Sequence, residues 1–337
     1  MNYQLNQEFF NDPNQPFLWC DRSDWGILEF TGEDRLRYLH NQSTNDFNQL
    51  QSEQGCQTVF VTSTARTLDL ATAYNTGEFV LVIVAPNRRE QLFKWLDGFI
   101  FPFDKVKLKD ISEQLATITL IGAKSHQIIS ELFKINLQDK PTGTNQSITF
   151  EDFTLTVAVG SDLGLPGYNL IIPKTKIDQI RTLLGQQQGE EINKETWEKL
   201  RILQGRPMPD KELTEDYNPL EAGLWDTISF EKGCYIGQET IARLNTYNGV
   251  KQKLWGIKLE NPVEPNTPIT LDDKKVGKLT SYTETDQGGF GLAYIKTKAG
   301  GSGLQVTVGE TTGELVSVPF VTHPNLDPPE KAEVVNS

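Results

Sequence analysis

The chain divides into a long first part, where strand-like and helix-like patterns alternate, and a last part made of short strands and glycine turns. Continuous apolar runs in the first part predict buried strands. Segments with apolar residues at helical spacing lie between them and predict amphipathic helices. We expect strands over residues 78–84, 115–121, 153–159 and 168–172, and helices over 31–41, 86–98, 123–133, 175–185 and 193–205.

Short polar motifs indicate where several of these helices begin and end. Thr31 with Asp34, and Thr175 with Asp178, have the spacing of a capping box, so both threonines are predicted N-caps. Asn193 is a further N-cap candidate. Glycines are predicted to close the later helices, at Gly185 and Gly205.

The pattern changes near residue 250, and beyond it no helix longer than one turn is expected. Closely spaced short strands are typical of a small antiparallel barrel. The fold class is therefore predicted as α+β, with two α+β lobes in 1–250, a small β-barrel in 251–325 and a disordered tail in 326–337. The barrel strands are expected at 254–259, 275–282, 289–294, 305–308 and 315–318.

Composition and charge exclude several classes of protein. The 337 residues carry a net charge of -13, which argues against direct, tight binding of nucleic acid through its phosphates. The longest apolar run, 79–85, is far shorter than the ~20 residues that cross a bilayer, so no membrane association is expected. Three scattered cysteines predict a reducing, cytoplasmic location, and the absence of CxxC and HxxxH patterns predicts no resident metal site.

The densest candidate for chemistry is the segment 232–239, with Cys234 at its centre. The cation of Lys232 and nearby backbone N–H groups would favour the thiolate form of Cys234. A structural cysteine buried in a glycine-rich loop is the alternative, because free cysteine is among the most buried residue types. The other members of this motif are Gly233, Tyr235, Gly237, Gln238 and Glu239.

This motif resembles the signature of the YgfZ family, the folate-binding relatives of glycine-cleavage T-protein. Segments 24–46, 201–207, 219–224 and 276–281 resemble other parts of the same family in the same order, so the resemblance covers roughly residues 20 to 320. It implies three lobes packed as a ring around a central channel that holds a tetrahydrofolate, the expected cofactor.

Four residues are candidate folate contacts through this resemblance. Trp25 and Trp197 match positions where YgfZ proteins carry folate-contacting tryptophans, although Trp197 shares a helical face with leucines and core packing is an alternative. T-proteins carry two adjacent acids where this chain has Asp69 and Leu70. Arg66 is similar to a basic residue common in YgfZ proteins.

The resemblance implies an accessory protein that supports assembly, insertion or repair of [4Fe–4S] clusters in client enzymes, including tRNA-modifying radical enzymes. Iron–sulfur proteins or assembly factors would be transient partners, and Cys234 would act in redox exchange or transient ligation. The chain then need not be an enzyme. The alternatives are a folate-dependent one-carbon transferase of the T-protein type and a plain folate-binding module.

Overall fold

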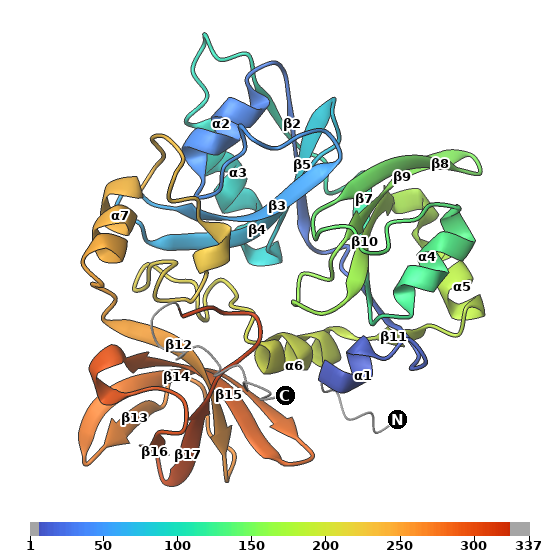
Figure 1. Ribbon diagram of the computed structural model, residues 1–337. Coiled ribbons are helices and arrows are strands. Elements are labelled where there is room, and N and C mark those ends of the chain that lie inside the picture. The colour runs from blue at the N-terminus through green and yellow to red at the C-terminus, as the bar shows by residue number, and fades with distance from the viewer. Residues whose placement is uncertain (1–6, 324–337) are drawn as a thin grey trace, which may run out of the picture.

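The computed structural model describes residues 7–323, which fold into two open sheets and one closed barrel (Figure 1). The tail predicted at 326–337 lies outside the described residues. Within residues 7–323, no helix is long and apolar enough to cross a membrane.

The first sheet has five antiparallel strands in the order β3-β4-β5-β2-β6. Every residue of β4 is buried, which places this strand at the centre of the molecule. Its residues Leu68, Ala71 and Ala73 pack with helices α2 and α3 in one core cluster. The bounds are β2 Gly26–Thr31, α2 Arg35–Gln42, β3 Gln54–Val61, β4 Thr67–Asn75, β5 Phe79–Val84, α3 Arg89–Asp97 and β6 Lys107–Asp110.

The second sheet has six strands in the order β11-β1-β7-β10-β9-β8. Strand β1, near the start of the chain, lies between β7 and β11 and pairs in parallel only with β11. Helices α4 and α5 cover the outer face of this sheet and share its core (Figure 1). The bounds are α1 Gln7–Asn11, β1 Leu18–Asp21, β7 Leu115–Ile121, α4 Ser125–Phe133, β8 Asn145–Phe150, β9 Phe153–Val159, β10 Gly167–Pro173, α5 Ile177–Gln186, β11 Glu190–Ile192 and α6 Lys194–Gln204.

The C-terminal strands close into a six-stranded barrel, as expected. The prediction missed β13, a strand of four residues too short to give a clear pattern, and placed the last strand too late. It also missed helix α7 (Gln238–Thr246), because the preceding glycines indicated a loop. The barrel strands are β12 Gln252–Leu259, β13 Pro268–Leu271, β14 Lys274–Thr285, β15 Gly288–Lys296, β16 Gln305–Val308 and β17 Thr311–Val316.

Of the three predicted N-caps, two are wrong and one is correct. Thr31 is the last residue of β2, and Thr175 lies in the 3-10 turn Lys174–Lys176 that precedes α5. Both sites lie where a strand leads directly into a turn, which delays the first helical residue. Helix α6 begins as predicted, since Asn193 accepts a hydrogen bond from the Thr196 N–H at 2.8 Å.

Glycines were also predicted to end two helices, and one of these two predictions is correct. Gly205 ends α6 in the left-handed region, with φ of 83°, a conformation in which glycine is favoured over residues with a Cβ. Gly185, predicted to close α5, is instead part of that helix, which continues to Gln186.

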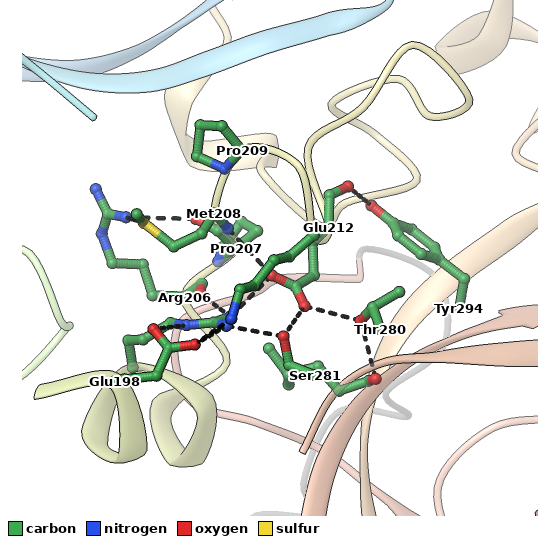
Figure 2. Close-up of polar contacts among 12 residues, drawn as sticks. Glu198, Arg206, Pro207, Met208, Pro209, Glu212, Thr280, Ser281 and Tyr294 are labelled. Atoms are coloured by element: carbon green, nitrogen blue, oxygen red, sulfur yellow. Dashed lines mark hydrogen bonds and ion pairs between the residues drawn. The ribbon is translucent and has the colours of Figure 1, made fainter. Parts of the chain in front are cut away.

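A buried ion pair between α6 and the segment that follows it is hydrogen-bonded to the barrel (Figure 2). Arg201 Nη1 donates to Glu212 Oε2 at 2.8 Å, and neither side chain has any exposed surface. The other carboxylate oxygen of Glu212 accepts from Thr280 at 2.8 Å and from Ser281 at 2.6 Å, both on β14. The Tyr294 hydroxyl of β15 donates to the Glu212 backbone carbonyl at 2.8 Å (Figure 2).

We predict that Glu212→Gln lowers the free energy of unfolding by about 3–5 kcal/mol, because it leaves the buried Arg201 guanidinium without its full countercharge. The matched control is Glu198→Gln, which removes the other carboxylate bound to Arg201 from a site that is one-third exposed. We expect a loss of about 1 kcal/mol or less there. Chemical denaturation measures both, and equal losses would contradict a dominant role of the Glu212 contact.

Candidate functional site

A cavity of about 560 Å³ lies between the first and second sheets. Strands β3 and β4 contribute Cys56, Thr72 and Tyr74, and the segment between β9 and β10 contributes Asp162. Phe320, from the segment after the barrel, also lines the cavity. Parts of the chain that are far apart in sequence therefore meet at one site. Further lining residues are Asn45, Gly55, Gln57, His126, Thr142, Leu165, Pro166 and Asp226.

Asp162 is the most strongly bonded acid in this cavity. Its carboxylate accepts hydrogen bonds from Arg22 at 2.7 Å, from Thr72 at 2.9 Å and from Asn169 at 3.1 Å. Burial by itself raises the pKa of Asp162, but Arg22 and Arg206 outweigh it, and the pKa lies below its usual value. The carboxylate is thus held ionised. Its backbone has φ of 61°, an uncommon conformation for a residue other than glycine.

The two predicted tryptophans come together beside this acid. The rings of Trp25 and Trp197 meet edge to face, with centroids 5.5 Å apart, and both are buried. The Arg22 guanidinium lies 3.7 Å from the Trp25 ring centroid, and Arg206 lies 5.1 Å from it. Cation–π contacts of this kind offset part of the desolvation of the two arginines. The aromatic faces therefore already have protein partners.

The tryptophans line a second, smaller cavity of about 160 Å³, together with Cys20, Arg22 and Met208. Arg22 connects the two cavities, since one of its nitrogens binds Asp162 while its guanidinium plane covers Trp25. Pockets for drug-sized molecules usually measure about 300–1,000 Å³. Only the larger of these two cavities reaches that size.

The other two predicted folate contacts lie elsewhere. Asp69 is fully buried on β4 and accepts a hydrogen bond from the Ala85 N–H at 2.9 Å. Burial raises the pKa of Asp69 to about 7. Arg66 lies in the turn between β3 and β4 and donates to the Asp216 carbonyl at 2.9 Å. Neither residue lines either cavity, so the structure does not bring them together with the tryptophans around a shared space.

Cys234 is the one exposed cysteine of the three, all of which lie in the described residues. Burial raises the pKa of Cys20 to about 11 and that of Cys56 to about 12. The alternative of a buried structural cysteine in the motif is therefore wrong for position 234.

The cation expected to activate Cys234 has another role. Lys232 is buried, and its Nζ donates to the carbonyls of His40, Ser43 and Asn45 at 2.5–2.7 Å. It thereby caps the C-terminal end of α2, where helix carbonyls lack partners. Burial lowers the pKa of Lys232 to about 7. The reason given from the sequence for a reactive thiol thus needs correction, because the ammonium is directed at backbone carbonyls.

The remaining motif residues shape the entry into α7. Gly237 is the N-cap, with φ of 82°, and a Cβ there would lie 2.9 Å from the Thr62 carbonyl. Gln238 and Glu239 form the first turn of the helix. Tyr235 is buried, with its ring centroid 4.5 Å from Lys232 Nζ.

Sequence reasoning missed Asp162 and the hydrogen-bonded network around it beside the larger cavity. Asp162, Asn169, Tyr74 and Arg22 belong to four different segments and form no short motif. Arg22 stands three residues before Trp25, but nothing local indicates that it binds an acid 140 positions later.

Comparison with known proteins decides the family. The model of the GCVT N-terminal domain matches residues 15–232, well over half of the chain. The chain belongs to the GCVT family. A chloroplastic protein of Arabidopsis thaliana, provisionally named a transferase, is 46% identical over 310 residues, which is 90% of this chain and 72% of that protein.

More distant members of the GCVT family carry the name aminomethyltransferase. One, from Caldanaerobacter subterraneus subsp. tengcongensis, is 26% identical over 304 residues, or 86% of this chain and 79% of that protein. The crystal structure of aminomethyltransferase T of the glycine cleavage system from Bartonella henselae superposes with a TM-score of 0.81 at 16% identity, covering 95% of this chain and 91% of that one.

These comparisons confirm the predicted α+β fold with its C-terminal barrel. They do not test the narrower resemblance to YgfZ or the cytoplasmic location. Both stay predictions. The motif residues from Gly233 to Glu239 lie just beyond the matched range.

We predict that Asp69→Asn changes how stability depends on pH. The pKa of Asp69 is about 7 in the folded chain and ~3.9 in an unfolded one, so the folded state binds more protons between these values. The stability of the wild type relative to the variant is therefore expected to fall as the pH rises from about 4 to about 7, by at most about 4 kcal/mol, and then to level off. Denaturant titrations at several pH values measure this.

The control for this experiment is Asp286→Asn, at an exposed turn position. We expect no pH-dependent difference from the wild type for that variant. A flat difference curve for Asp69→Asn would mean that Asp69 is ionised throughout in the folded protein.

Proposed function

We propose that this chain is a tetrahydrofolate-binding accessory protein that supports assembly, insertion or repair of [4Fe–4S] clusters in client enzymes. The tRNA-modifying radical enzymes are among the clients we propose. The observation that carries the proposal is the 560 Å³ cavity with an ionised acid at its base, in a member of the GCVT family.

The lining of this cavity is suited to a pterin with an attached aromatic ring. Tyr74 and Phe320 supply aromatic surface, which serves flat ligand rings. A carboxylate offers about four acceptor positions, and the described partners of Asp162 occupy three. The remaining position would accept an N–H of the ligand, such as the amino group of a pterin.

The same lining argues against aminomethyl transfer. Leu165 and Pro166 line the cavity where T-proteins have an acidic loop. Leu70, at the position of their second acid, packs in an apolar core. Asp69 is directed at the Ala85 N–H, and Asp162 is bound to a guanidinium. A general base must be within reach of the proton it removes; Asp69 does not line this cavity, and the Asp162 carboxylate is already bound by Arg22.

A folate-dependent one-carbon transferase is the second candidate. The names of the relatives favour it, because several are aminomethyltransferases and one is provisionally a transferase. A reconstituted glycine-cleavage assay tests this alternative directly. Turnover of ~1 per second or more would be typical of an enzyme and would favour the transferase over the accessory role.

The role of Cys234 follows from its exposure. No group of three or more His, Cys, Asp or Glu side chains in residues 7–323 is arranged to hold a metal. Iron–sulfur clusters need several thiolates, so a single thiol would act on a cluster only together with a partner protein or a small thiol. We therefore propose transient contacts with iron–sulfur proteins or assembly factors and, given the net charge of -13, no tight contact with nucleic acid.

We predict that tetrahydrofolate binds in the larger cavity and changes the fluorescence of nearby tryptophans. Thr142 is exposed and lines the cavity, so Thr142→Trp is expected to obstruct it and weaken binding at least tenfold, about 1.4 kcal/mol. Thr149→Trp is the matched control, because Thr149 is exposed on β8 and lines neither cavity. Calorimetric titration with tetrahydrofolate measures the affinities.

The same titration separates the two cavities. If Trp25→Phe weakens binding while Thr142→Trp does not, the ligand occupies the smaller cavity lined by Trp25 and Trp197. The absence of heat, thermal shift and fluorescence change in the wild type would refute folate binding altogether.

We predict that neither Cys234→Ala nor Thr142→Trp restores function in a host whose own gene for this protein has been deleted. The readout is the activity of [4Fe–4S] enzymes in cell extracts, because the proposed role needs both the thiol and the folate. Cys20→Ala serves as the matched control, at a buried cysteine outside the motif. If Cys234→Ala restored full client activity, the thiol would have no part in the function.

A further inference from the structure

The loop that carries Cys234 is fastened at both ends to the end of helix α2. Before the cysteine, Lys232 Nζ donates to the His40 carbonyl at 2.5 Å. After it, the Ile236 N–H donates to the Asn41 carbonyl at 3.0 Å. Cys234 therefore lies midway along a short span held directly over residues 40 and 41, with its side chain exposed.

The His40 imidazole lies beneath this span. Its side chain is 8% exposed, and Nδ1 lies 2.9 Å from Asp46 Oδ1. Because an ionised carboxylate only accepts hydrogen bonds, Nδ1 carries the proton and Nε2 has a free lone pair. Nε2 lies 4.0 Å from the point that a Cβ of Gly233 would occupy. Among residues 7–323, no hydrogen-bond partner satisfies Nε2.

We propose that Cys234, His40 and Asp46 form a thiol–disulfide exchange site in which His40 Nε2 accepts the Cys234 proton and Asp46 orients the imidazole. The substrate class is a small or protein-borne disulfide. The inference deepens the proposed function, since it gives Cys234 a defined reaction. The same arrangement activates other cysteine nucleophiles: a histidine next to the cysteine acts as the base, and a third residue orients its ring.

The proposed reaction balances without any further reagent. The Cys234 Sγ–H proton moves to His40 Nε2, and the thiolate attacks one sulfur of the disulfide. A new S–S bond to Cys234 forms while the original S–S bond breaks. The departing thiolate then takes the proton from the His40 imidazolium. Overall, one disulfide and one thiol become another disulfide and another thiol.

The charges around His40 favour its neutral form, which is the form that accepts a proton. Burial lowers the pKa of His40, and the nearby ammonium of Lys232 lowers it further, while Asp46 acts in the opposite direction. Cys56 is the other titratable group there, within electrostatic reach of both Lys232 and Asp46. Substitution of Cys56 is therefore part of the test.

The test measures exchange of the folded full-length chain with an aromatic disulfide that releases a coloured thiolate, and with glutathione disulfide. All variants carry Cys20→Ser and Cys56→Ser, so that only Cys234 reacts. We expect His40→Gln to slow exchange at pH 7 about 10-fold to 100-fold. We also expect it to remove the step in the pH–rate profile that imidazole protonation produces. Asp46→Asn is expected to give a smaller loss with the same change of profile.

His323→Gln is the matched control, because His323 is similarly buried but lies beside the Leu254 carbonyl. We expect its rates and pH profile to equal those of the parent that carries only Cys20→Ser and Cys56→Ser. Thermal unfolding establishes that each variant is folded. If His40→Gln does not fold, the test uses Asp46→Asn instead. An unchanged pH profile in a folded His40→Gln or Asp46→Asn variant would overturn the inference.

The outcome is independent of the folate titration. If His40→Gln slows exchange but the wild type binds no folate, the thiol site stands and the proposed folate role fails. If folate binds and Cys234 is needed in cells, but the exchange rate is unchanged in His40→Gln, the accessory role stands and this inference fails.

Discussion

The buried pair of Arg201 and Glu212 is the contact on which the arrangement of the barrel depends. Two fully desolvated charges are tolerable only when hydrogen bonds satisfy nearly all of their remaining positions, and here both α6 and strand β14 supply them. Because the partners must lie in one geometry to satisfy the carboxylate, the helix and the barrel have a defined relative position (Figure 2). Apolar contact alone, being non-directional, would specify that position less sharply.

This contact continues into the candidate site through Arg206. Arg201 donates to the Arg206 carbonyl at 3.4 Å, and the Arg206 side chain then lies near both tryptophans and within electrostatic range of Asp162. Desolvation lowers the pKa of Arg206 to about 10, which reflects how completely it is enclosed. Asp162 is thus held ionised by Arg22 and Arg206, and the α6–barrel junction helps to position the second of these cations.

Buried cations that donate hydrogen bonds to particular carboxylates or carbonyls occur repeatedly in this protein. Arg22 binds Asp162 and covers Trp25, while Lys232 donates to three carbonyls at the end of α2. In each case the cation joins segments that lie more than 100 residues apart. The Lys232 contacts hold the loop that carries Cys234 against the end of α2, where His40 lies. A residue that the sequence indicated as an activator of the thiol acts instead by positioning it.

The sequence by itself determined those elements of structure that depend only on residues close together in the chain. The strands 115–121 and 153–159 were predicted with their observed bounds, because a continuous apolar run has few alternatives to a buried strand. Asn193 and Gly205 were predicted as caps, since cap and helix are adjacent in the chain. The change of pattern near residue 250 predicted an α+β part followed by a barrel, and the family motifs agreed with it.

Only the tertiary structure decided the pairing of Arg22 with Asp162, the carbonyls bound by Lys232 and the placement of Asp69 away from both cavities. These contacts join segments that are distant along the chain, and no local pattern encodes which buried charge meets which acceptor. The cost of leaving a desolvated charge unpaired selects those partners, and it acts only once the sheets have packed together.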